Sequence, residues 1–315
     1  MRTIERVTEL AAATSAAPAL RATRRRWGED VIKAMLAVCA LVSIATTVGI
    51  VVALLQPTID FFRVVSIVDY LTGTEWAPLF EPPLFGVLPL VVGTLSVTLW
   101  ACIIAMPFGL GAAIYLSEYA HPRARKTLKP ALELLAGIPT VVYGFFALTF
   151  VTPLLRDIGI DVEIFNALSA GLVMGVMLIP TVASLSEDAM TAVPQSLRDG
   201  AYGLGASKLQ VSTRIVVPAA VSGIVASYVL AISRAVGETM IVLLAAGQQA
   251  NFTFDPLRAV ETMTAFIAAT GQGDVPTDTI EYKTIFAVGF TLFAMTFAMN
   301  LIAIRLVRKY REVYE

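Results

Sequence analysis

The chain is dominated by long apolar stretches that contain no charged side chain. These stretches lack the regular alternation of apolar and polar positions that marks a half-buried strand. A helix needs about 20 residues to cross about 30 Å of hydrocarbon, and each stretch is close to that length or longer. We therefore predict six transmembrane helices, with approximate bounds 33–55, 87–117, 130–155, 165–185, 217–246 and 284–306.

These spans predict an all-α polytopic membrane protein, because backbone polar groups in lipid are satisfied only within helices or closed barrels. We expect a tail over residues 1–30, a six-helix domain over 31–310 and a second tail over 311–315. The composition agrees with this class. Hydrophobic residues make up 57% of the chain and charged residues 15%, whereas soluble domains carry about 25% charged residues.

Lysine and arginine gather on one side of the predicted membrane. They are concentrated in the N-terminal tail, the connection 118–129, the loop 187–218 and the C-terminal end. Cytoplasmic segments carry such an excess, so we predict both termini in the cytoplasm and a multi-pass location in the inner (plasma) membrane. The run Arg24–Arg26 fits an anchor at anionic membrane lipid. Nucleic-acid binding is not expected, because no aromatic residues accompany these charges.

Residues that carry chemistry are few. Cys39 and Cys102 lie inside apolar spans and indicate no disulfide or metal site. His121, before a proline, is expected to be a turn residue. The stretch Gly200–Ser207 lacks the lysine of a phosphate-binding P-loop. We therefore expect no cofactor, no metal and no catalytic residue. A membrane enzyme is disfavoured, and energy has to come from another protein.

The polar loop 187–218 has a distinctive layout. Its anchor positions are Asp199, Gly200, Ala201, Gly205, Ile215 and Pro218. The layout resembles the EAA loop of ABC importer permeases, in which the first three positions are Glu-Ala-Ala. The resemblance implies two short helices that are broken at Gly205 and dock into a groove on a cytoplasmic ATPase. An ordinary connection between two helices is the alternative interpretation.

Two stretches inside the spans combine glycine, proline or charge with apolar residues. In the third span, Gly137 and Pro139 predict a packing kink, and Tyr143 and Gly144 follow at once. In the fifth span, the spacing of Arg234 and Glu238 places both on one helix face within pairing distance. Charged side chains at this depth usually mark a transport pathway, although a structural ion pair is the alternative.

Both stretches are similar to those of phosphate importer permeases of the PstC type: AGIPTVVYGFF over 136–146 and RAVGETM over 234–240. The similarity extends over about 85–310 and implies a type I (MetI-like) ABC importer permease fold. It also implies a phosphate pathway near Arg234 and Glu238. The implied partners are a second, homologous permease (PstA-like), an ATPase dimer (PstB-like) and an extracytoplasmic phosphate-binding protein (PstS-like). A permease for another oxyanion or small solute, and a secondary transporter or channel, remain alternatives.

Within this expectation, the two charged residues have separate roles. The planar guanidinium of Arg234 can bind two oxygens of an oxyanion at once. Phosphate near neutral pH still carries a proton, which Glu238 can accept as a hydrogen bond. Sulfate carries no proton, and Glu238 would repel it. We therefore expect Glu238 to favour phosphate over sulfate.

Overall fold

The computed structural model describes residues 27–309, so most of the predicted N-terminal tail, including Arg24–Arg26, and the C-terminal tail 311–315 lie outside the described residues. Contacts divide the chain into two units, 1–52 and 53–315. The described part of the first unit belongs to helix α2, Trp27–Phe62. The first predicted span lies inside this helix, whose apolar window has a mean hydropathy of 2.6.

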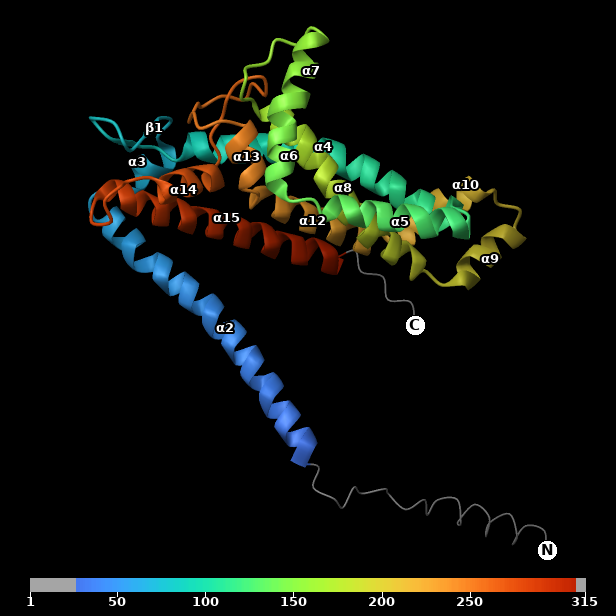
Figure 1. The fold of residues 1–315 in the computed structure, drawn as a ribbon. Coiled ribbons are helices and arrows are strands. Elements are labelled where there is room, and N and C mark those ends of the chain that lie inside the picture. Colours follow the sequence, from blue (N-terminus) through green and yellow to red (C-terminus); the bar gives the residue numbers. More distant parts are fainter. Residues whose placement is uncertain (1–26, 310–315) are drawn as a thin grey trace, which may run out of the picture. The chain divides into compact units, whose positions relative to one another are not determined.

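The second unit is built around long helices that lie lengthwise against one another (Figure 1). They are α4 (Leu88–Ile114), continued by the π-helical turn η1 (Tyr115–Tyr119), α8 (Ala167–Thr191), α12 (Val221–Val236) and α15 (Ile280–Lys309). Glycines let α4 and α8 approach closely. A Cβ on Gly171 would lie 2.5 Å from Trp100 Cβ, and one on Gly175 would lie 2.7 Å from Ile104 Cβ. This glycine spacing is typical of tightly packed membrane helices.

Four helices in the described part of the chain are long and apolar enough to cross a membrane. Two further spans are formed only if bent helix pairs are counted. One is α5 (Pro122–Ala136) with α6 (Thr140–Phe146), η2 (Ala147–Val151) and α7 (Thr152–Asp157), bent by 85°. The other is α10 (Lys208–Val211), η3 (Ser212–Val216) and α11 (Val217–Ala219) with α12, bent by 69°. The bend of the first pair lies at the break between Ala136 and Thr140, which contains Gly137 and Pro139.

The fifth predicted span, 217–246, is not one helix. The chain turns at Ala220, and α12 ends at Val236 with Gly237 as its C-terminal cap. A separate short helix, α13 (Met240–Ala245), follows. Hydropathy registers only that these residues are apolar, whereas glycine and the capping interactions decide where the helix stops.

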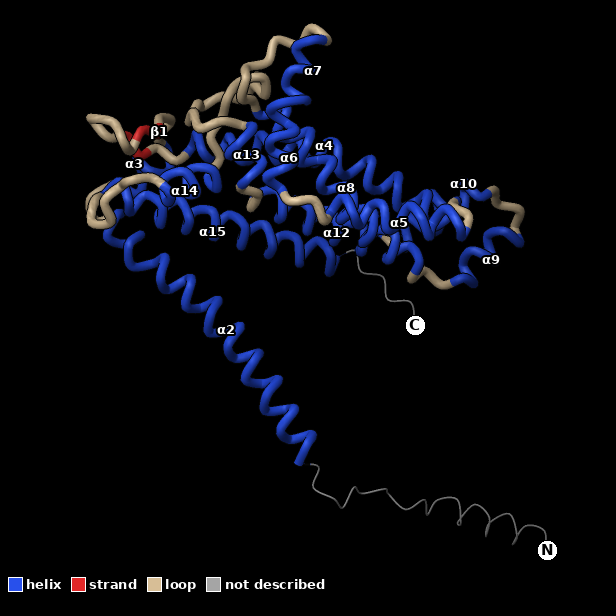
Figure 2. Tube along the Cα trace, viewed as in Figure 1, coloured by secondary structure: helices blue, strands red, loops and turns tan. Residues whose placement is uncertain are grey.

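The two ends of the second unit differ in structure (Figures 1 and 2). One end holds α3 (Ile67–Thr72), α14 (Met263–Gln272) and a small hairpin, in which β1 (Trp76–Ala77) pairs antiparallel with β2 (Leu84–Phe85). Aromatic rings fill this end: Tyr70 and Phe266 both contact Trp76 edge to face. The opposite end holds α9 (Gln195–Gly203) and α10.

Candidate functional site: an exposed hollow and a polar break in the bundle

The loop with the EAA-like layout forms two short helices, as predicted. Helix α9 ends at Gly203, and Gly205 follows with φ +82°. Glycine adopts this left-handed conformation without the steric penalty that other residues pay. Ser207 then begins α10 with a capping box, because its hydroxyl accepts from the Gln210 amide and the Gln210 side chain accepts from the Ser207 amide. The break between the two helices therefore lies at Gly205, the position that the resemblance implied.

Three of the six motif residues line an open hollow of about 410 Å³. Ala201, Gly205 and Ile215 contribute to it, together with Leu204 and Arg214. Leu204 is 91% exposed at the rim, and a Cβ on Gly205 would meet nothing within 4 Å. The structure thus brings three of the six motif residues together around one cavity.

The other motif residues lie outside the hollow. Asp199 accepts a hydrogen bond from Gln195 Nε2 at 3.0 Å. A Cβ on Gly200 would meet nothing within 4 Å, and Pro218 lies exposed in α11. In the chain, Asp199 and Gly200 come before the residues that line the hollow and Pro218 comes after them, but none of the three lines it.

A buried arginine, which the sequence analysis did not single out, fixes α9 to the bundle. Arg198 is 8% exposed and donates to the carbonyls of Val193 (2.5 Å) and Met190 (2.8 Å). Its guanidinium also contacts Glu118 Oε1, in η1 at the end of α4, at 3.1 Å. Partly buried, multiply hydrogen-bonded arginines hold a fixed geometry. Helix α9, which precedes the hollow at Gly205, is therefore tied to the ends of both α4 and α8.

A second ionic cluster ties α5 to α8. Glu187 is fully buried and contacts Arg125 and, at 2.8 Å, Lys129 Nζ. Lys129 Nζ also lies 3.3 Å from Asp188. Removing one member of a buried ion pair leaves an uncompensated charge and is strongly destabilising. This cluster fixes α5 before the 85° bend. His121 caps the start of α5 by accepting from the Arg123 amide at 3.3 Å, as a turn residue would.

After the bend that follows α5, helix α6 places Gly144 against α13. A Cβ on Gly144 would lie 3.1 Å from the Met240 carbonyl oxygen and 2.9 Å from Leu244 Cδ1. Tyr143 donates its hydroxyl hydrogen to the Leu135 carbonyl at 2.8 Å, across the Gly137–Pro139 break. The backbone of α13 thus approaches α6 closely at Gly144.

The expected pairing of Arg234 with Glu238 is not formed in the described part of the chain. Because α12 ends at Val236, the two residues do not lie one turn apart on a continuous helix. Glu238 is 9% exposed, and its Oε1 accepts from the amides of Met240 (3.0 Å) and Ile241 (3.3 Å). A carboxylate at a helix N-terminus satisfies free N–H groups in this way. Glu238 therefore satisfies the first two amides of α13, although Thr239 is the residue that precedes the helix.

Arg234 has a different environment. It is exposed, and its Nη1 lies 3.3 Å from Thr181 Oγ1 on α8. No carboxylate lies within ion-pair distance of it among the described residues. A guanidinium left open at the level of a helix break is able to meet an anion. The two predicted pathway residues thus lie on either side of the same break but do not bind each other.

Comparison with known proteins identifies the class. Residues 105–312 match the family described as "Binding-protein-dependent transport system inner membrane component". The chain belongs to this family. It is a multi-pass membrane component of an ABC-type transport system, and members of this family are the non-catalytic components of such systems.

Similar curated proteins and solved structures extend this result. A probable ABC transporter permease protein, YqgH, of Bacillus subtilis is 35% identical over 87% of this chain and 89% of its own length. The phosphate transport system permease protein PstC of Xylella fastidiosa is 35% identical over 77% and 80%, and that of Haemophilus influenzae is 31% identical over 89% and 93%. A chain of the bacterial alginate ABC transporter shares the fold with a TM-score of 0.62 at 17% identity, over 91% of this chain and 98% of its own.

Proposed function

We propose that the chain is a transmembrane permease subunit of an ATP-driven inorganic phosphate importer. The observation that carries the proposal is the coupling surface: a motif-built hollow on two exposed short helices, tied to the bundle through Arg198. Relatives that carry the name phosphate transport system permease protein PstC support phosphate as the substrate.

In this proposal the chain forms half of the translocation pathway. A second, homologous permease supplies the other half, and an ATPase dimer binds the hollow around Gly205. An extracytoplasmic phosphate-binding protein delivers the anion. Both termini face the cytoplasm, and so do α9 and α10, which we call the coupling helices. This orientation agrees with the distribution of lysine and arginine.

Arg234 is the proposed contact for the anion, because its guanidinium is exposed and unopposed by a carboxylate in the described part of the chain. Glu238 keeps its proposed role in selectivity. The hydrogen bonds it accepts from described residues go to Oε1, which leaves Oε2 for the proton of a phosphate. Another oxyanion as substrate is the competing proposal, and the same assay separates the two.

The test is uptake by the complete assembly in proteoliposomes, with phosphate and sulfate in competition. Wild type is expected to take up phosphate, to depend on ATP and to exclude sulfate. Glu238→Gln keeps an oxygen for the two amides of α13 but removes the negative charge. We expect it to reduce the preference for phosphate over sulfate about tenfold or more, which corresponds to about 1.4 kcal/mol. An unchanged preference contradicts the role of Glu238, and sulfate uptake by wild type contradicts the proposed substrate.

A further inference from the structure

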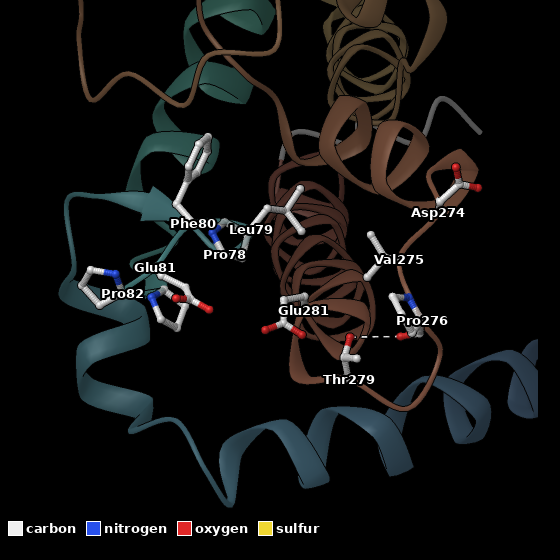
Figure 3. Close-up of a pocket in the computed structure, with 11 residues that line it drawn as sticks. Pro78, Leu79, Phe80, Glu81, Pro82, Asp274, Val275, Pro276, Thr279 and Glu281 are labelled. Atoms are coloured by element: carbon white, nitrogen blue, oxygen red, sulfur yellow. Dashed lines mark hydrogen bonds between the residues drawn. The ribbon is translucent and has the colours of Figure 1, made fainter.

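Two adjoining hollows open at the end of the second unit opposite the coupling helices. Both lie between the loop that follows β1 and the segment that follows α14. One hollow, of about 840 Å³, is lined by Glu81, Asp274 and Glu281 (Figure 3). The other, of about 700 Å³, shares Asp274 and reaches Glu261. We call the pair the acidic cleft, defined by these four carboxylates. No lysine or arginine of the described residues lines either hollow.

Glu261 is the unusual member of the cleft. It is 7% exposed, and its burial is not accompanied by a hydrogen-bond or ion partner for the carboxyl group among the described residues. Its carboxyl oxygens are not fully enclosed and still reach the open space of the cleft. Two contacts with α4 fix the backbone here. The carbonyl oxygen of Glu261 packs on Gly93, and the amide of Met263, two residues later, donates to Thr94 Oγ1 at 3.0 Å. A buried carboxyl without a partner is costly. This side chain is therefore held in the cleft without the interactions that would stabilise its charge.

Burial raises the pKa of Glu261 to about 7. A nearby residue provides the contrast: Glu163 accepts from the Ala259 amide at 2.7 Å and from Arg258 at 2.9 Å, and these hydrogen bonds hold its pKa below the usual value. Asp274 is the other acidic group that lines the same hollow as Glu261. Trp76, in the same wall, has its buried Nε1 without an acceptor in the described part of the chain.

The lining predicts the chemistry of the occupant. Negative charge at Glu261 and Asp274 is combined with the apolar side chains of Leu79, Phe80 and Phe266. Lysine and arginine match this combination, because their long stems pack on apolar surface while the charged head reaches an acceptor. Aromatic rings add to the attraction of a cation. The described residues hold no cluster of three or more His, Cys, Asp or Glu that could bind a metal ion. A bare phosphate would be repelled.

We propose that the acidic cleft receives basic side chains of the extracytoplasmic binding protein, with Glu261 as the carboxylate at its floor. The inference rests on the proposed function, which places this end away from the cytoplasm. The charge of the cleft, and its position opposite the coupling surface, support this occupant. Binding requires an ionised Glu261, so association should strengthen as pH rises from 6 to 8.

The experiment uses the complete assembly in lipid nanodiscs and the phosphate-loaded binding protein as probe, with affinity measured by biolayer interferometry at pH 6 and pH 8. Wild type is expected to bind about tenfold more tightly at pH 8, because a carboxyl with a pKa near 7 is mostly protonated at pH 6. Glu261→Gln should weaken binding at pH 8 about tenfold or more and remove most of the pH dependence. Carbodiimide cross-linking should join Glu81 or Glu281 to lysines of the binding protein.

The matched control is Asp157→Asn, which removes an exposed carboxylate of α7 outside the cleft and should bind like wild type. Equal binding by wild type and Glu261→Gln at both pH values overturns the inference, as does an equal loss in Asp157→Asn, which indicates a diffuse charge effect. Phosphate uptake by the same samples separates failure of the cleft inference from failure of the proposed function. Uptake by wild type with unaltered binding by Glu261→Gln rejects only the cleft, whereas no binding and no uptake by wild type reject the proposed function as well.

Discussion

At the scale of single residues, the guanidinium of Arg234 is the group on which the proposed anion pathway depends. Its Nη1 hydrogen bond to Thr181 is long, at 3.3 Å, and the side chain is exposed. Arg234→Lys keeps the positive charge but loses the planar fork that binds two oxygens. We expect phosphate uptake to fall about tenfold or more, measured in proteoliposomes with the complete assembly.

The matched control for this substitution is Arg63→Lys. Arg63 is exposed directly after the end of α2 and contacts Asp60 of that helix at 3.0 Å. Exposed ion pairs of this kind contribute little. Uptake by this variant should equal that of wild type. Full uptake by Arg234→Lys would show that the anion does not need bidentate contact with this residue.

The raised pKa of Glu261 also predicts how the stability of the protein depends on pH. Its folded-state pKa of about 7 lies above the ordinary value of 4.5, so the folded protein binds the extra proton more tightly than the unfolded chain does. Stability from this group is therefore fully present below about pH 4.5 and is lost as pH rises through 7. The loss is about 3 kcal/mol at most. Glu261→Gln should show a smaller fall in melting temperature between pH 5 and pH 8 than wild type, measured by differential scanning fluorimetry in detergent. Identical pH profiles would contradict the unpartnered state of Glu261.

At the scale of elements, the coupling helices form a surface that is firmly held from behind. Arg198 joins α9 to α8 and η1, while the hollow around Gly205 faces outward. If an ATPase docks at the hollow as proposed, Arg198 connects that docking site to the ends of two long helices.

Gly205→Asp tests this arrangement. The φ of +82° disfavours any residue with a Cβ, and the added carboxylate enters the hollow that we propose the ATPase occupies. We expect uptake to fall at least tenfold while the protein still reaches the membrane, and ATP hydrolysis no longer to depend on transport. Gly203→Asp, at the end of α9 and outside the hollow, is the matched control and should keep most of the coupling. Equal uncoupling by both variants, or by neither, would contradict docking at Gly205.

The sequence predicted elements well where composition alone decides them. The spans at 33–55, 87–117, 165–185 and 284–306 are each contained in or nearly coincide with one long helix. The break at Gly205 and the kink at Gly137 and Pro139 were predicted because glycine and proline act locally. The Arg234–Glu238 pair was wrong, because helical periodicity was extended through Gly237. Glu118 and Arg198 were missed because a contact across 80 residues exists only in the folded chain.

At the scale of the whole second unit, one helix connects the two proposed functional ends. Near its start, α4 contacts the segment of Glu261 through Gly93 and Thr94. At its end, η1 supplies Glu118 to the arginine that holds α9. The glycines of α8 pack against α4 between these points. A tightly packed pair of helices transmits displacement because protein interiors are dense. The proposed binding at the cleft and the proposed docking at the hollow would therefore act on the same element.

The same architecture predicts that the chain does not transport alone. Arg234 is exposed on this subunit, as expected for one wall of a pathway whose other wall belongs to a second permease. In the proposed function, ATP hydrolysis comes from a separate ATPase, and this chain belongs to a family of membrane components. Purified chain in phosphate-loaded liposomes should therefore show neither ATP hydrolysis nor phosphate efflux above empty liposomes, whereas the complete assembly should show both ATPase activity and uptake. Efflux down a gradient through the chain alone, blocked by Arg234→Lys, would identify it as a channel or secondary carrier and contradict the ATP-driven importer.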